Sequence, residues 1–169
     1  MPFKERAREA QKNLSLPLEE VAASAVGEGD RRSSMKVLVI GGGGREHAVC
    51  RKLSESKDVT ELLCAPGNAG IARVARCIPD VKATDIDGIV ALAKREKVDF
   101  VCVTPDDPLA LGCVDRLEAE GIAAFGPTAY AAQMEASKIF SKNLMRKYGI
   151  PTAKCEIFTE MEKALAYLD

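Results

Sequence analysis

The sequence predicts an α/β protein with a Rossmann-like parallel sheet flanked by helices. Two observations lead to this fold class. From Met35 onward, short apolar runs alternate with stretches of helical periodicity, as they do in βαβ units. The first apolar run also passes through four glycines, residues 41–44, straight into a helical pattern. A strand that enters a helix through glycines is typical of turns that bind phosphate.

Four apolar runs are the expected strands, at residues 36–40, 60–65, 98–103 and 122–125. They are short and bounded by turn residues or charges, which is typical of strands buried in a parallel sheet. Ligands bind such sheets at the carboxyl ends of the strands. The loops over 41–46, 66–70 and 104–108 are therefore expected to lie together at a binding edge.

The first two helices follow from apolar spacing and capping residues. Ala48, Val49 and Leu53 are expected on the inner face of the helix after the glycines. Thr84 with Asp87 resembles a capping box, which predicts a helix over 85–97.

Two further helices complete the predicted unit. Asp107 is the expected N-cap of the third, with Pro108 at its first position, and Gly121 ends it. A fourth helix is expected over 129–135.

The two ends of the chain differ from this central unit. Residues 1–34 have few large apolar side chains and are expected to be an extension or linker, disordered and without a targeting signal. At the other end, residues 137–148 and a segment capped by Thr159 and Glu162 predict helices, and residues 154–158 predict a strand. We expect residues 137–169 to be weakly stabilised, because helices of this length are marginal without partners.

Composition narrows the class of protein. The 24 basic and 25 acidic residues nearly balance, which makes nucleic acid an unexpected partner. The six cysteines form no C-x-x-C pair and are interpreted as reduced core thiols, so a cytoplasmic protein without a metal site in this chain is expected. No apolar run approaches membrane-spanning length, so a membrane partner is not expected.

The glycine turn is the first candidate site. The amides of Gly43 and Gly44 and the start of the following helix can bind an anion, and Arg45 adds a positive charge. The alternative is a tight turn without a ligand. A dinucleotide site is disfavoured, because Glu46 occupies the position of the third glycine in G-x-G-x-x-G. The end of the second strand also lacks the carboxylate that binds a ribose there.

Four motifs in order resemble one family, at residues 41–48, 65–70, 125–128 and 136–142. Together they are similar to phosphoribosylamine–glycine ligases of the ATP-grasp superfamily, over Met35 to Asp169. The resemblance implies a substrate-binding domain over 35–136 and the incomplete start of an ATP-grasp lobe over 137–169. One departure lies at 104–109, where the commoner family form has glycine-proline-glutamate, so Asp106 brings a shorter carboxylate.

The resemblance implies a reaction in purine biosynthesis. ATP activates the carboxylate of glycine as glycyl phosphate, and the amine of 5-phosphoribosylamine attacks it to give glycinamide ribonucleotide. ATP and Mg²⁺ (or Mn²⁺) would be bound mainly by a portion after Asp169. The chain alone is therefore expected neither to hydrolyse ATP nor to form product.

The expected substrate-binding residues are Gly43, Gly44, Arg45, Glu46, Asn68, Gly70 and Asp106. Gly43, Gly44 and Arg45 would bind the phosphate, and Glu46 would hold the ribose or the amine unless it only favours the helix start. Turn chemistry is the alternative role for Asn68 and Gly70. His47 is expected to pack under the glycine loop. Lys138 would reach the nucleotide phosphates, or else be a solvated lysine.

Two other functions stay open from the residues alone. One is a stand-alone module that binds a ribose phosphate. The other, less favoured, is an NAD-dependent oxidoreductase.

Overall fold

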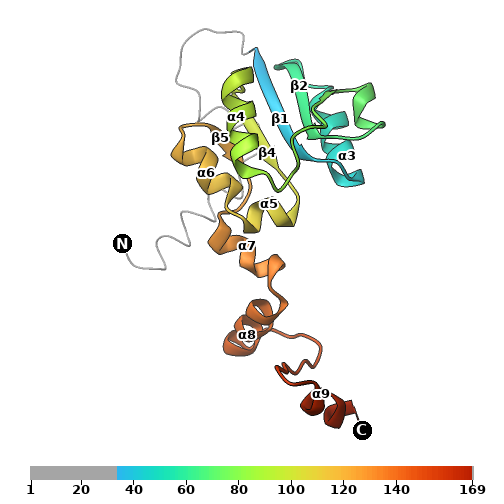
Figure 1. Cartoon of the computed structure of the whole chain (residues 1–169), viewed down its shortest axis with the longest axis vertical. Coiled ribbons are helices and arrows are strands. Elements are labelled where there is room, and N and C mark those ends of the chain that lie inside the picture. The colour runs from blue at the N-terminus through green and yellow to red at the C-terminus, as the bar shows by residue number, and fades with distance from the viewer. Residues whose placement is uncertain (1–33, 169) are drawn as a thin grey trace. The chain divides into compact units, whose positions relative to one another are not determined.

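The structure is a computed structural model that describes residues 34–168 (Figure 1). The predicted extension over residues 1–34 lies outside the described residues, apart from Ser34. Within the described part, no helix is long and apolar enough to cross a lipid bilayer.

The centre of the fold is a five-stranded parallel sheet in the order β3-β2-β1-β4-β5. Its strands are β1 (Met35–Gly41), β2 (Val59–Pro66), β3 (Arg76–Cys77), β4 (Phe100–Val103) and β5 (Ala123–Phe125). The chain moves outward from β1 through β2 to β3, and then crosses to the other side of β1 to form β4 and β5. The predicted α/β fold class is confirmed.

The apolar content of a strand depends on its position in the sheet. β1 has a neighbour on each side, and its residues from Val37 to Gly41 are all buried. A strand covered on both faces reads as a continuous apolar run, which is why β1 could be predicted. β3 has only two residues, Arg76 and Cys77, and this length is too short to produce a pattern in the sequence.

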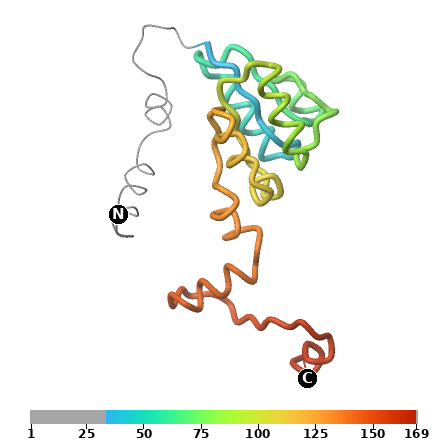
Figure 2. The backbone as a smooth tube through the Cα atoms, turned by 60° about the vertical axis from the view of Figure 1, so that its left-hand side comes forward, coloured from blue at the N-terminus to red at the C-terminus, as the bar shows by residue number. Residues whose placement is uncertain are grey.

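Helices cover both faces of the sheet. Figure 1 shows α3 (Gly44–Leu53) and α4 (Ile86–Glu96) on opposite sides of it. Cys50 of α3 and Ile71 of the short η1 helix (Ile71–Arg73) pack on the face that carries Val39 and Cys64. The opposite face packs against α4, α5 (Asp106–Ala110) and α6 (Cys113–Ala119). Figure 2 shows the path of the chain through these strands and helices, from blue at β1 to yellow at α5.

Several helix details differ from the predictions. The side chain of Asp85, not Thr84, caps α4 by accepting a hydrogen bond from the Gly88 amide at 3.0 Å. Pro105 is the N-cap of α5, so Asp107 lies in the first turn and is not the cap. Ala48 is exposed, and Cys50 takes the buried position on α3.

The predicted third helix is divided in two. Gly112 has φ +79°, a conformation that ordinary residues rarely adopt, and it separates α5 from α6. Gly121, the predicted end, also has a positive φ and follows α6 closely.

The last part of the described chain carries little core. α7 (Ala129–Ala136) buries Ala132, whereas α8 (Lys138–Tyr148) and α9 (Met161–Leu168) bury no residue. The strand predicted over 154–158 is wrong, because these residues have no strand assignment. Strands need hydrogen-bonded neighbours, and within residues 34–168 this segment pairs with none. The predicted domain boundary after residue 136 stays a prediction.

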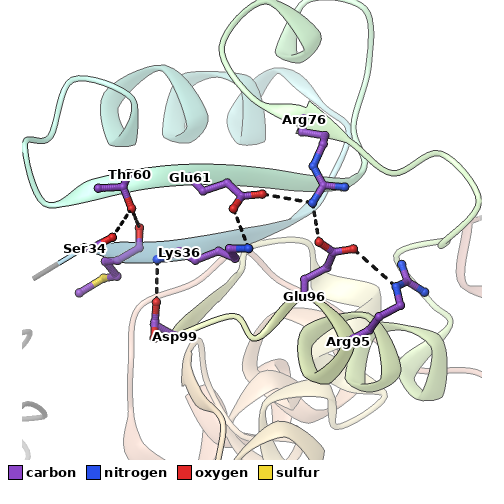
Figure 3. Close-up of polar contacts among 9 residues, drawn as sticks. Ser34, Lys36, Thr60, Glu61, Arg76, Arg95, Glu96 and Asp99 are labelled. Carbon is purple, nitrogen blue, oxygen red and sulfur yellow. Dashed lines mark hydrogen bonds and ion pairs between the residues drawn. The ribbon is translucent and has the colours of Figure 1, made fainter.

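An ionic cluster lies at the amino-terminal end of the sheet (Figure 3). Glu61 of β2 pairs with Lys36 of β1 at 2.6 Å and with Arg76 of β3 at 3.2 Å. Arg76 also contacts Glu96 at the end of α4, at 2.5 Å. This amino-end cluster links three neighbouring strands to α4 through partly exposed side chains.

Candidate functional site

The loops after β1, β2 and β4 meet at the carboxyl-terminal edge of the sheet. β1 lies between β2 and β4, and the chain changes direction across the sheet at β1. The gap between β1 and β4 is therefore the topological switch point, where open α/β sheets bind ligands. The three loops predicted from sequence do lie on this edge.

Glycines allow the first two loops to approach one another. Gly41 has φ +123°, and a β-carbon there would lie 2.6 Å from Cγ of Glu46 and 2.8 Å from Cγ of Pro105. A β-carbon on Gly42 would lie 2.7 Å from the Gly67 carbonyl oxygen. Contacts this short exclude a side chain at either position. The glycine run thus serves loop packing as well as any ligand.

Glu46 joins the glycine loop to the loop after β4. Its carboxylate accepts hydrogen bonds from the Gly43 amide (2.7 Å), the Thr104 hydroxyl (2.7 Å) and Nε of Arg45 (3.2 Å). The residue is only 4% exposed. Both carboxylate oxygens already have protein partners. The role of Glu46 as a substrate contact stays a prediction.

The same contacts set the charge state of Glu46. Burial pushes its pKa upward, but the hydrogen bonds from Thr104, Gly43 and Arg45 outweigh burial and hold the pKa below its ordinary value. The site therefore contains a buried, ionised carboxylate.

Thr104 is a site residue that the sequence did not single out. It follows β4 directly, and its hydroxyl reaches Glu46 although the two residues are 58 positions apart. A threonine at a strand end is ordinary in sequence. Only the parallel pairing of β1 with β4 brings the two loops together.

Asn68 joins the second loop to the first. Its side-chain amide donates to the Gly42 carbonyl at 2.7 Å, and its Oδ1 accepts from the amides of Gly70 (2.8 Å) and Ile71 (2.9 Å). The predicted turn chemistry of Asn68 and Gly70 is therefore present, and their substrate contact stays a prediction. A β-carbon on Gly70 would lie 2.9 Å from Cε1 of His47, so the imidazole packs against the second loop. Its expected place under the glycine loop stays a prediction.

The open part of the site lies at the start of α3. Gly43 and Gly44 are the predicted phosphate ligands, but the Gly43 amide already donates to Glu46. Gly44 and Arg45 occupy the first positions of α3, where amides have no carbonyl partner within the helix. Among residues 34–168, neither of these amides donates a hydrogen bond. The pair available to an anion is therefore Gly44 and Arg45.

Arg45 supplies the positive charge beside these amides. Its side chain is 55% exposed and lies between two carboxylates, Glu46 at 3.2 Å and Asp106 at 3.7 Å. Asp106 also lines a cleft of about 190 Å³ between α5 and α7, together with Leu109, Met134 and Glu135. An anion bound to Arg45 would compete with Asp106, whereas an amine or hydroxyl could use the Asp106 carboxylate.

Lys138 is the residue expected to contact the nucleotide phosphates. Lys138 is exposed at the first position of α8, a helix without buried residues. Within residues 34–168 no group of three or more His, Cys, Asp or Glu side chains is arranged to hold a metal ion. The expected contact of Lys138 with the nucleotide phosphates stays a prediction.

Sequence comparison identifies relatives for most of this unit. The family model described as "Phosphoribosylglycinamide synthetase, N domain" matches residues 35–135. A phosphoribosylamine–glycine ligase of Xanthomonas campestris pv. campestris is 53% identical over 135 residues, which cover 79% of this chain and 31% of the relative. The ligase of Caldanaerobacter subterraneus subsp. tengcongensis is 46% identical over 134 residues, with coverages of 79% and 32%. The chain thus spans about a third of the length of these relatives.

Solved structures show the same architecture. The crystal structure of phosphoribosylamine–glycine ligase from Thermotoga maritima matches with a TM-score of 0.55 and 26% identity, over 79% of this chain and 30% of that one. The biotin carboxylase domain of a thermophilic 2-oxoglutarate carboxylase matches with a TM-score of 0.56 over 79% of this chain and 33% of that one. Its 17% identity shows a shared fold alone.

Proposed function

Because this chain belongs to the phosphoribosylglycinamide synthetase N-domain family, we propose that it is the ribose-phosphate-binding part of a phosphoribosylamine–glycine ligase. The observation that carries the proposal is the pair of open amides at Gly44 and Arg45, beside the exposed guanidinium of Arg45. Helix-start amides and a guanidinium are groups that bind phosphate. The ligase joins 5-phosphoribosylamine to glycine in purine biosynthesis, and this domain would bind the first of these substrates.

In this proposal the buried Glu46 and the exposed Asn68 position the ligand-binding groups. Glu46 and Asn68 hold the glycine loop from two sides, through Gly43 and Gly42. The loop can then accept a phosphate without reorganising its backbone, which reduces the entropic cost of binding. Glu46 and Asn68 are still proposed to contact the ribose of the substrate. Gly70 would contact the substrate because its loop lies beside the glycine loop.

Asp106 is the proposed contact for the amine or a hydroxyl of the substrate. Its carboxylate lies beside Arg45 and faces the cleft between α5 and α7. A substrate with a phosphate and an amine would then place opposite charges on Arg45 and Asp106.

ATP and Mg²⁺ belong to the ligase reaction as the resemblance implies it. ATP supplies the phosphate that activates glycine, and Mg²⁺ neutralises the nucleotide phosphates. Lys138 is the one residue here proposed to contact the nucleotide. The proposed binding of the ribose phosphate by the described residues requires neither ATP nor Mg²⁺.

Calorimetric titration with ribose 5-phosphate tests the proposal. The whole chain should bind this ligand, and Arg45→Ala should weaken binding by about tenfold or more, since charged hydrogen bonds contribute about 1.5–3 kcal/mol. Arg51→Ala is the matched control, because Arg51 lies on the same helix with an exposed side chain and should leave binding unchanged. Equal affinities of the two variants would contradict the proposed site.

Asp106→Asn separates the two proposed charge contacts. It removes the competitor for Arg45, so inorganic phosphate should bind more tightly. A ligand whose amine uses Asp106 should bind less tightly. Loss of phosphate binding in this variant would contradict the proposed arrangement.

A stand-alone ribose-phosphate module is the alternative, and it predicts the same binding without a ligase partner domain. An NAD-dependent oxidoreductase is disfavoured by the family and by the buried Glu46 side chain at the third glycine position.

A further inference from the structure

Cysteines form a row across one face of the sheet, directly beneath the candidate site. Cys64 of β2 pairs in register with Cys77 of β3, and Val39 of β1 lies between Cys64 and Cys102 of β4. Residues paired in register on parallel strands point to the same face, and all four belong to the cluster that α3 covers. Cys64 and Cys77 are thus neighbouring thiols on adjacent strands.

Each of these two thiols is bonded to a different loop of the site. Sγ of Cys64 donates to the Gly41 carbonyl at 3.2 Å, at the base of the glycine loop. Sγ of Cys77 donates to the Asn68 carbonyl at 3.6 Å, in the second loop. A β-carbon on Gly67 would lie only 2.4 Å from this sulfur, so the thiol fills the space under that loop.

The two thiols differ in accessibility. Cys77 is half-buried, whereas Cys50, Cys64 and Cys102 are buried. The hydrogen bond to Cys50 and burial raise the pKa of the Cys64 thiol, and burial raises that of Cys102 to about 11. A reagent from solvent therefore meets Cys77 first, and Cys64 is the thiol in register beside it.

We propose that Cys64 and Cys77 form an oxidation site, at which a hydroperoxide makes an intrachain disulfide that loosens both loops. The Cys77 sulfur attacks hydrogen peroxide, the O–O bond breaks, and Cys77 sulfenic acid and water form. The Cys64 sulfur then attacks the sulfenic sulfur of Cys77, and the S–O bond breaks. The displaced hydroxide accepts the proton of the Cys64 thiol and leaves as a second water. Two thiols and one peroxide give one disulfide and two waters.

The strand geometry is compatible with this bond. Adjacent strands lie about 4.7–4.9 Å apart, which is within the roughly 4.4–6.8 Å between α-carbons that disulfides span. Oxidation removes both S–H donors at once, from the carbonyls of Gly41 and Asn68. Each carbonyl keeps one backbone donor, Gly67 for Gly41 and Ala72 for Asn68. The fold should therefore persist while the loops become looser.

Peroxide treatment of the whole chain, followed by peptide mapping and amide hydrogen exchange, tests this inference. We expect one linked peptide pair containing residues 64 and 77, reversed by dithiothreitol. Exchange of the Gly70 and Ile71 amides, which donate to Asn68, should speed up severalfold in the oxidised chain. Cys77→Ser keeps a hydroxyl donor for Asn68 and should abolish both effects.

Cys155→Ser is the matched control, since Cys155 is also half-buried but lies far along the chain, and it should behave as the parent. A disulfide between Cys50 and Cys64, or unchanged exchange after the 64–77 link forms, would overturn the inference. The exchange readout uses no ligand, so it stands even where ribose 5-phosphate fails to bind. Where that ligand binds, oxidation should weaken its affinity in the parent and not in Cys77→Ser.

Discussion

The two ends of the parallel sheet carry acidic residues in opposite surroundings. At the amino-terminal end, Glu61 and Glu96 pair with Lys36 and Arg76, and all four side chains keep contact with solvent. At the carboxyl-terminal end, the Glu46 carboxylate is buried and bonded to a backbone amide and a hydroxyl. Exposed ion pairs are screened by water and salt, whereas a buried carboxylate depends on each hydrogen bond.

This difference predicts how each end of the sheet responds to the loss of one carboxylate. The amino-end cluster can lose one charge and let the others rearrange. The carboxyl-end loops cannot lose Glu46 without leaving the Gly43 amide and the Thr104 hydroxyl without their partner. Rigid positioning at one end of the sheet is what a preformed binding site requires.

The largest expected effect is steric and lies at Gly41. Gly41→Ala adds a β-carbon 2.6 Å from Glu46 at a φ of +123°, and should lower the free energy of unfolding by about 2–5 kcal/mol. Denaturant titration measures this. Gly44→Ala is the control, because a β-carbon there has no atom within 4 Å, and stability should stay equal or rise slightly. Similar losses in both variants would contradict the packed-loop account.

The next effect concerns the bond between the loops. Glu46→Gln places an amide where one acceptor stood, and Thr104→Val removes the donor, each with an expected loss of about 1–3 kcal/mol. The double variant should lose less than the sum, because both changes remove one shared interaction. Denaturant titration of the four proteins gives the coupling, and strict additivity would mean that the 2.7 Å contact contributes nothing.

Acid should destabilise the carboxyl-terminal end of the sheet through Glu46. Its pKa is lowered in the folded protein, so its contribution is complete above its unfolded value, near 4.5, and is lost as pH falls through the folded pKa. The parent should therefore lose more stability than Glu46→Gln between about pH 7 and about pH 3. Parallel pH profiles of the two proteins would show that Glu46 has an ordinary pKa in the folded state.

The smallest expected effect lies at the amino end. Glu96→Gln breaks its contact with Arg76, but Arg76 keeps Glu61 as a partner. Thermal unfolding should change little, and the change should vanish in high salt. A loss as large as that of Glu46→Gln would remove the contrast between the two ends.

Local patterns in the sequence were enough to predict the α/β fold class and the edge of the sheet at which the three loops meet. The glycine run, the apolar strands and the turn residues after β2 each act over a few positions, so a pattern reveals them. The Glu46–Thr104 bond could not be predicted, because it joins residues that only strand pairing brings together. Gly43 was expected to bind phosphate, but its amide donates to the Glu46 carboxylate three positions further on in the same helix start. Residues 154–158 have an apolar pattern in the sequence, but within residues 34–168 they pair with no strand.

The most direct test of the account is an NMR titration of the whole chain with ribose 5-phosphate, followed at backbone amides. The account predicts that the Gly44 and Arg45 amides shift first and saturate, while those of Lys36 and Asp99 at the amino end do not move. Saturating shifts that avoid the start of α3, or that are equal at both ends of the sheet, would contradict a preformed phosphate site at the carboxyl-terminal edge.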